Sequence, residues 1–195
     1  MNTTKLLIAL GLAGLAAAAS AQTAADITQR DVNQETRIRN GLQDGSLTTR
    51  EAAILEKKEA GVDRMQANAL KDGKLSDAER ARITRAENHV SGDIKGARGN
   101  GVDGNPLSAS SQRMQQGVQR DINQEQRIHD GVASGQLTNK EASRLERGQA
   151  RTDRKEFRAG RDGHVGAHEA QAVDNRQDAQ SERIHKLRHN GAHRG

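Results

Sequence analysis

Apolar residues recur at helical spacing through most of the chain. Two sets each fall on one side of a helix: Leu55, Val62, Met65 and Ala69, then Ile83, Ala86, Val90 and Ile94. Residues three, four and seven apart share a helix face. The pattern predicts an all-α fold with helices over 26–43, 49–70, 77–94, 114–133, 139–159 and 167–188. The apolar stripes are narrow, so we expect thin contacts between these helices.

Composition also indicates a modest core. Leu, Ile, Val and Phe make up 26 of the 174 residues after position 21, and Phe157 is the only aromatic residue. Their share of about 15% is below the roughly 20% at which disorder becomes a serious alternative. The chain has no cysteine, so its stability must come from packing and helix propensity without disulfides. We expect alanine-lined helix contacts.

Residues 1–21 have the three parts of a secretory signal peptide. Lys5 is positively charged, residues 6–18 are apolar, and Ala19-Ser20-Ala21 is a small-x-small cleavage site. The apolar run is shorter than the roughly 20 residues needed to span a bilayer. We therefore expect cleavage after residue 21, no transmembrane anchor, and a mature protein in the periplasm or secreted.

The chain matches itself at an offset of ninety residues. Residues 30–56 and 120–146 are identical at 15 of 27 positions. This indicates a duplicated unit of three helices, with one copy at 22–95 and the other at 113–188. Residues 96–112 are rich in glycine and serine and predict a flexible linker. Residues 189–195 form a tail rich in His and Arg.

A Gly-x-Leu-Thr-x-x-Glu pattern recurs between the predicted helices. Its glycine is expected to end one helix, its Thr or Ser to cap the next, and its glutamate to complete a capping box. The capping turns are predicted at Gly45, Thr48, Gly73, Ser76, Gly135, Thr138 and Gly163.

The same turns resemble EF-hand calcium loops, which need a glycine at place six and a glutamate at place twelve. The candidate ligands of these loops are Asn40, Asp44, Glu51, Asn68, Asp72, Glu79, Asp130, Glu141 and Asp162. The third place has no side-chain oxygen in any turn, whereas calcium takes six to eight oxygen ligands. Caps are therefore the favoured interpretation, and calcium binding is the alternative.

Histidines concentrate in the second copy and its tail. His164 and His168 are four residues apart, as are His185, His189 and His193, and Glu169 follows His168. This spacing stacks imidazoles on one helix face, where two can share zinc, nickel or copper. Weak binding of such a divalent metal is one hypothesis; a solvated basic tail is the other. No cofactor is otherwise indicated.

The charged residues suggest a solvated surface. After residue 21 there are 30 basic and 26 acidic side chains, interleaved along the chain. Acid pairs such as Asp31 and Glu35 are expected to lie on helix surfaces, with no pocket to shift their pKa values. The lack of aromatic residues argues against specific nucleic-acid binding, although loose contact with nucleic acid or anionic lipid is compatible with basic helices. No catalytic motif is present, so we expect no catalytic residues and no enzyme.

Two resemblances accompany this pattern. The residues around Asn33-Gln34-Glu35, with the first turn and Asp63-Arg64, resemble small exported helical repeat proteins of proteobacteria, which implies no activity. Residues 47–51 and 137–141 read LTxxE, which resembles the LTxxQ motif of Spy-like periplasmic chaperones. That resemblance implies a chaperone-like protein with exposed amphipathic helices.

The leading hypothesis from the sequence is a non-enzymatic envelope stress protein of the binding or chaperone-like class, which holds other proteins weakly. The alternatives are a periplasmic metal-binding protein and a structural module. The chaperone hypothesis rests on the thin apolar stripes, the metal hypothesis on the histidines and EF-hand-like turns.

Overall fold

The computed structural model describes residues 9–192, with side chains from residue 24 onward. This part of the chain is all-helical, without strands: α1 (Ala9–Asp44), α2 (Thr49–Ala69), the 3-10 helix η1 (Leu70–Asp72), α3 (Asp77–Arg98), α4 (Ala109–Ala133), α5 (Asn139–Gly160) and α6 (Ala167–Arg188). The predicted all-α fold is confirmed. The predicted signal peptide, residues 1–21, and His193 lie outside the residues whose side chains are described.

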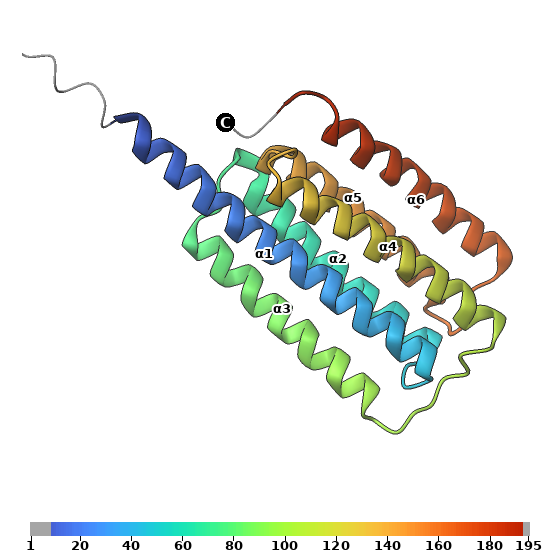
Figure 1. Ribbon diagram of the computed structural model, residues 1–195. Helices are drawn as coiled ribbons and strands as arrows, with labels where there is room; N and C mark the ends of the chain where they lie inside the picture. The colour runs from blue at the N-terminus through green and yellow to red at the C-terminus, as the bar shows by residue number, and fades with distance from the viewer. Residues whose placement is uncertain (1–8, 193–195) are drawn as a thin grey trace, which may run out of the picture.

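Four helices form the centre of the molecule. The largest helix contacts join α2 to α5 and α1 to α4. In the view of Figure 1, α1 and α4 lie in front of α2 and α5. Helix α3 packs against α1 and α2, and α6 packs against α4 and α5. The flanking helices thus close the two sides of a four-helix centre.

The contacts of the first half recur ninety residues later. Leu47 N donates to Gly41 O over 2.8 Å, and Leu137 N donates to Gly131 O over the same distance. Arg37 donates to the Ser91 hydroxyl and carbonyl. Arg127 does the same at Ser181. The two halves of the chain therefore use matching side chains at matching positions.

Small residues allow α2 and α5 to pack closely. Ala53, Ala60 and Ala67 are seven residues apart on α2, and all are buried. The Ser143 hydroxyl of α5 donates to Ala67 O over 2.5 Å. A Cβ atom at Gly160 would lie 2.9 Å from the Cβ of Ala53, which is too close, so glycine is required there. These contacts join the start of each helix to the end of the other, so the pair is antiparallel.

The segment predicted as a flexible linker makes specific contacts. Residues 109–112 belong to α4. Gly104 N donates to Gly45 O over 2.8 Å, and Asn100 Nδ2 donates to Glu51 Oε1 over 2.6 Å. A Cβ atom at Gly104 would collide with the backbone carbonyl of Leu47. The connection is thereby held against the turn between α1 and α2.

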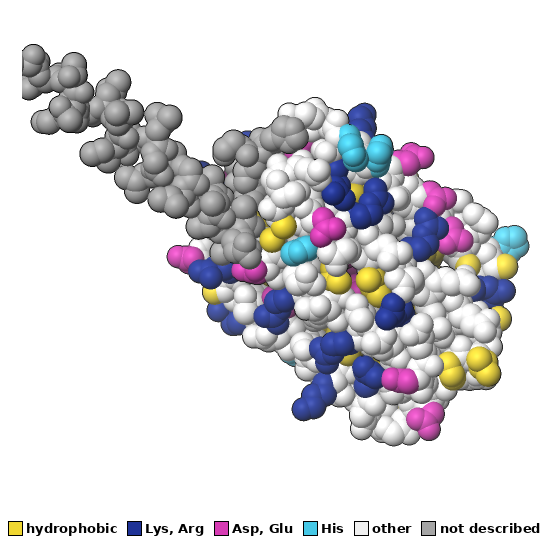
Figure 2. Space-filling model, viewed as in Figure 1, with side chains coloured by type: hydrophobic (Ala, Val, Ile, Leu, Met, Phe, Trp, Pro, Cys, Tyr) yellow, Lys and Arg dark blue, Asp and Glu magenta, His cyan; other side chains and the backbone are white. Residues whose placement is uncertain are grey.

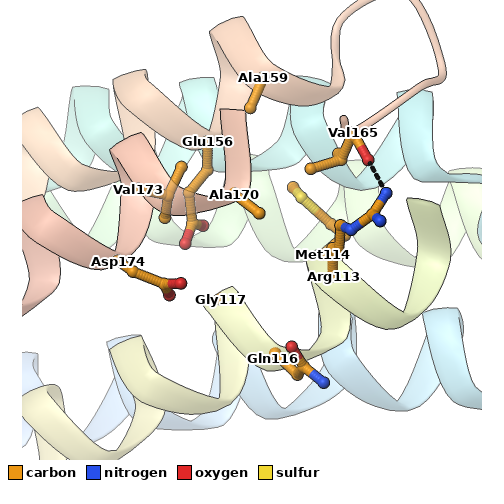
Figure 3. Close-up of a pocket in the computed structure, with 10 residues that line it drawn as sticks. All are labelled: Arg113, Met114, Gln116, Gly117, Glu156, Ala159, Val165, Ala170, Val173 and Asp174. Atoms are coloured by element: carbon orange, nitrogen blue, oxygen red, sulfur yellow. Dashed lines mark hydrogen bonds between the residues drawn. The ribbon is translucent and has the colours of Figure 1, made fainter. Parts of the chain in front are cut away.

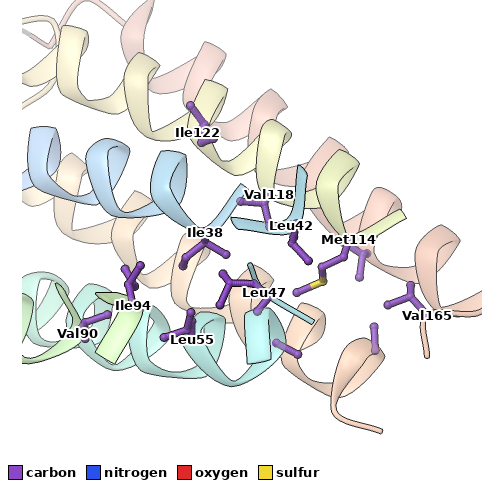
Figure 4. Close-up of a cluster of buried hydrophobic side chains, with 14 of the residues drawn as sticks. Ile38, Leu42, Leu47, Leu55, Val90, Ile94, Met114, Val118, Ile122 and Val165 are labelled. Atoms are coloured by element: carbon purple, nitrogen blue, oxygen red, sulfur yellow. The ribbon is translucent and has the colours of Figure 1, made fainter. Parts of the chain in front are cut away.

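Apolar side chains pack in separate clusters. One, with Ile128, Val132, Leu137, Leu145 and Ile184, lies where α4 finishes, and a larger one lies where α1 finishes and α4 begins. Figure 4 shows Ile38, Leu42, Leu47, Met114 and Val118 gathered there from α1, α4 and the first turn. Met65, placed on the apolar stripe by the sequence, is 37% exposed. Within the described residues, no helix has an apolar stretch long enough to cross a membrane. The middle of the bundle is filled by other residues.

Candidate metal sites

Acidic residues occupy core positions in the middle of the bundle. The inward stripe of α2, continued into η1, contains Ala52, Glu56, Glu59, Asp63, Gln66 and Leu70, spaced alternately by four and three residues. All six are buried, and Glu56 is 0% exposed. Positions at this spacing face the neighbouring helices of a bundle. The acids of α2 therefore point into the centre.

Eleven carboxylates are buried inside the bundle, apart from the cap residue Glu141. They are Asp31, Glu35, Glu56, Glu59, Asp63, Glu87, Asp121, Glu125, Glu146, Asp153 and Glu156. No Lys or Arg in the described part of the chain is buried with them. The expectation that Asp31 and Glu35 are surface charges is wrong, because they are 2% and 4% exposed. The side of α1 that carries Asp31 and Glu35 faces the other central helices.

The first carboxylate site consists of Asp31 on α1, Asp63 on α2 and Glu146 on α5, with Glu125 of α4 beside them. One oxygen from each of the first three lies within 4.8 Å of the others. Burial is the main cause of the raised pKa of Asp31 and Asp63, and the charge of Glu125 adds to it at both residues, after that of Asp153 at Asp63, so Glu125 belongs to the same group of charges. Each of the four central helices thus contributes one carboxylate.

The second carboxylate site has the same residue types as the first, at positions offset by ninety in the sequence. Glu56, Asp121 and Asp153 bring one oxygen each within 4.8 Å of the others. Burial raises the pKa of Glu56 and Asp153, and the charge of Glu35 adds to it, after that of Asp121 at Asp153. Each residue of this site lies ninety residues from a residue of the first site. A ligand that one half of the chain contributes to the first site is therefore matched, in the second site, by a ligand from the other half.

Several oxygens in the two sites have no hydrogen-bond donor. Within the described chain, no group donates to either oxygen of Glu56 or of Glu146, nor to Oδ2 of Asp121. Glu56 and Glu146 are both 0% exposed. A buried carboxylate without donors costs far more than a solvated one. These oxygens need a positively charged partner or a proton.

Glutamine side chains hold one aspartate of each site. Gln66 Nε2 donates to both oxygens of Asp31, over 3.0 and 2.9 Å. Gln177 Nε2 donates to Asp121 over 3.1 Å and to Glu156 over 3.0 Å. Neutral donors fix the orientation of a ligand without neutralising its charge. They act as supporting groups of the kind found around metal ligands.

Burial is the main cause of raised pKa values in this interior. It raises the pKa of Glu59 to about 8, with Glu87 adding to the effect and Arg37 opposing it. It also raises the pKa of Glu87 to about 7 against the Arg30 charge, and that of Asp121 to about 6. At about 1.4 kcal/mol for each pKa unit, ionising Asp121 alone costs about 3 kcal/mol, against a typical total stability of about 5–15 kcal/mol.

The donor set favours a hard cation of calcium size. Four carboxylates offer up to eight oxygens, which matches the six to eight that Ca²⁺ takes. Magnesium dehydrates reluctantly and keeps several waters, so a buried carboxylate cage suits it poorly. Zinc and copper prefer imidazole or thiolate, and neither carboxylate triad contains a histidine.

A small cavity lies beside the buried Glu156. It has a volume of about 20 Å³, enough for about one water, and lies between α4, α5 and α6. Figure 3 shows the Glu156 carboxylate directed past Gly117, where a Cβ atom would lie 2.6 Å from Oε1 of Glu156. Glycine at this position makes room for the carboxylate beside Asp121.

The predicted histidine ligands come together only in part. The His185 and His189 rings are 4.3 Å apart between centroids, and His189 Nδ1 lies 2.7 Å from the His185 carbonyl. His164 Nδ1 lies 2.9 Å from the Ser110 hydroxyl. His168 and Glu169 line a surface hollow of about 210 Å³ beside Lys155 and Arg158. In the described residues, neither group of three possible acidic or histidine ligands includes a histidine.

The residues of the predicted EF-hand-like turns make capping and turn contacts. Glu51, Glu79 and Glu141 each accept from the backbone N of the capping residue over 2.9 to 3.0 Å, and Thr48, Ser76 and Thr138 accept in return. Gly45, Gly73, Gly135 and Gly163 have φ between 76° and 92°, a left-handed conformation that favours glycine.

The acidic side chains of these turns have partners nearby. Asp44 accepts from the Ser46 hydroxyl and from Arg98. Asp72 and Asp162 accept from the backbone two residues on, and Asp130 accepts from Gln126. Asn40 Oδ1 accepts from Arg39, while Asn68 is exposed. The carboxylate triads of the described chain contain none of these residues.

The two carboxylate sites had a signal in the sequence. Asp31, Glu35, Glu56 and Asp63 all recur unchanged at the ninety-residue offset, at spacings of four and seven that share a helix face. Comparisons with protein-family models, curated proteins and solved structures found no match. The site therefore has to be interpreted from its own chemistry.

Proposed function

We propose that this protein binds two hard multivalent cations of calcium size, one in each buried carboxylate site, and that it is a metal-binding protein without enzymatic activity. The observation that carries the proposal is the pair of fully buried triads, Asp31–Asp63–Glu146 and Glu56–Asp121–Asp153, each with oxygens within 4.8 Å. A bound cation would neutralise charges that the fold otherwise holds at high cost.

The proposal includes the wider setting predicted from the sequence. The protein acts outside the cytoplasm after residues 1–21 are removed, and its two halves are copies of one unit. Duplication explains why two sites share one ligand pattern: each site takes two helices from each copy, so neither copy alone has a complete set of four carboxylates. On this proposal the turns act as caps, and the histidines are not needed for the two ions.

Isothermal titration of the mature protein, residues 22–195, with Ca²⁺ at pH 7.5 tests the proposal. We expect two ions per chain for the wild type, one for Glu56→Gln, and none for Glu56→Gln combined with Glu146→Gln. Each substitution removes one anionic ligand and keeps the side-chain shape. Glu182→Gln, on the exposed surface of α6, is the matched control and should retain both ions.

Two outcomes would reject the proposal. One is the absence of binding by the wild type to Ca²⁺, Mn²⁺ and La³⁺, with helicity by circular dichroism confirming that the chain is folded. The other is unchanged stoichiometry in the double variant, which would place the bound ions elsewhere, for instance at the turns.

A further inference from the structure

The outward faces of α2 and α5 form a continuous basic surface. On α5 and the residue that follows it, basic residues recur at alternating spacings of four and three: Lys140, Arg144, Arg147, Arg151, Arg154, Arg158 and Arg161. On α2 and η1 they recur every seven residues: Arg50, Lys57, Arg64 and Lys71. These spacings keep side chains on one side of a helix. We call these eleven residues the basic face.

The acids of the same two helices lie elsewhere. Glu56, Glu59 and Asp63 on α2, and Glu146, Asp153 and Glu156 on α5, are all buried in the interior. The remaining glutamates, Glu51 and Glu141, are engaged as caps at the helix starts. Acids come close only at the margins of the face, at Asp72, Asp162 and Glu169. The middle of the basic face therefore has one sign of charge.

Contacts show that the two rows of cations form one surface. Helices α2 and α5 pack side by side along their length. Arg50 and Lys57 of α2 line the same surface hollow as Arg161, which directly follows α5, so the two rows meet there. At 1.5 Å per residue, the α5 row extends over about 30 Å.

The molecule as a whole separates its charges between inside and outside. The 26 acidic residues less the eleven buried ones leave 15 to face the 30 basic residues after position 21. On the face seen in Figure 2, which belongs to the α1 and α4 side, Lys and Arg are spread among acidic side chains. The opposite side, formed by α2 and α5, carries the continuous basic face.

Apolar side chains accompany the cations. Ile54 is 40% exposed between Arg50 and Lys57. A hollow of about 610 Å³ is lined by Arg50, Ile54, Lys57, Phe157, Arg161 and Asp162, and Lys57 Nζ lies 5.0 Å from the centre of the Phe157 ring. The hollow thus combines cations suited to a phosphate group with apolar surface suited to the acyl region next to it.

We propose that the basic face docks the protein on a bilayer surface rich in anionic phospholipid. A bilayer surface matches cations spread along two adjacent helices, whereas duplex DNA is read by elements that enter a groove. Single-stranded nucleic acid is bound through exposed aromatic residues, and the only aromatic residue here is covered by Lys57. Basic residues next to an anionic leaflet each add to binding.

Vesicle co-sedimentation of the mature protein tests this inference. Phosphatidylcholine vesicles with and without 30% phosphatidylglycerol are compared at pH 6.5, in Ca²⁺ and in EGTA. We expect binding only to the anionic vesicles, in both conditions, and its loss as salt rises from about 0.05 to 0.5 M. Binding in EGTA separates this inference from the proposed metal function.

Two variants with the same change in net charge locate the surface. R147Q/R151Q/R154Q/R158Q neutralises four residues of the basic face, and K74Q/R82Q/R85Q/K95Q neutralises four exposed residues of α3 and the turn before it. With about 1 kcal/mol per basic residue, the first variant should lose about two to three orders of magnitude in vesicle partitioning, and the second less than about threefold. Equal losses would overturn the assignment of the face. Absence of wild-type binding, or tighter binding to duplex DNA at the same salt, would overturn the membrane partner.

Discussion

Replacement of a buried ligand should stabilise the metal-free protein and weaken its binding of metal. In Asp121→Asn, the side chain keeps its shape, and its oxygen still accepts from Gln177, which donates over 3.1 Å in the wild type. The change removes a carboxylate whose pKa is raised, mainly by burial, from 3.8 to about 6. The folded state therefore holds the Asp121 proton more tightly than the unfolded chain does.

The sign and size of the effect follow from this difference. A raised pKa in the folded state means that stability is full below pH 3.8 and is lost as pH rises through about 6. At about 1.4 kcal/mol per pKa unit, ionisation of Asp121 costs about 3 kcal/mol above pH 7. D121N removes that cost, so the metal-free variant should gain up to about 3 kcal/mol, or roughly 6–12 °C in Tm for a chain of this length.

Thermal unfolding in EGTA, followed by circular dichroism at pH 4, 6 and 8, measures the effect. We expect little difference between the proteins at pH 4 and a growing advantage for D121N up to pH 8. In Ca²⁺ the order should reverse, because the wild type alone has both sites complete. Asp103→Asn, at an exposed position in the loop before α4, should change neither profile. A pH-independent loss of stability in D121N would show that ionisation of Asp121 does not destabilise the metal-free protein.

Three further predictions follow from the same structure. Ca²⁺ binding should release protons near pH 6.5, because burial raises the pKa of the ligands Asp31, Asp63 and Glu146 well above their ordinary values and that of Asp121 to about 6; titration in buffers of different ionisation enthalpy measures the number of protons, and zero would contradict the ligand assignment. His185→Ala combined with His189→Ala should change the Ca²⁺ affinity less than about twofold, because neither ring lies in a triad. Calorimetry checks this. A tenfold loss, which corresponds to about 1.4 kcal/mol, would indicate that the histidines bind the ion. Gly104→Ala should lower the unfolding free energy by about 1–3 kcal/mol and speed proteolysis between residues 99 and 108, whereas Gly96→Ala, which meets nothing within 4 Å, should do neither.

The helices could be predicted from the sequence because local signals determine them. The second helix was expected at 49–70 and runs from Thr49 to Ala69, continued by η1. Its start depends on Thr48 and Glu51, which lie three residues apart and need no distant partner to form a capping box. The last helix was placed at 167–188, as observed.

The site could not be predicted in the same way, since burial of a charge is decided by packing between distant segments. Periodicity assigns Glu56, Glu59 and Asp63 to a polar face, because an isolated acid is more stable in water. Helix α5 covers that face, and its position depends on alanines and on Gly160, whose role appears only when the helices meet. The repeated acids are visible in the sequence at the ninety-residue offset, but the sequence does not show that they meet inside the bundle.

Anomalous diffraction from crystals of the mature protein grown with Tb³⁺, a strongly scattering substitute for calcium, would locate the bound ions. We expect two peaks inside the four-helix centre, one bounded by Asp31, Asp63 and Glu146 and the other by Glu56, Asp121 and Asp153. Peaks found only at the surface turns or at His185 and His189, with none in the interior, would contradict the two proposed sites.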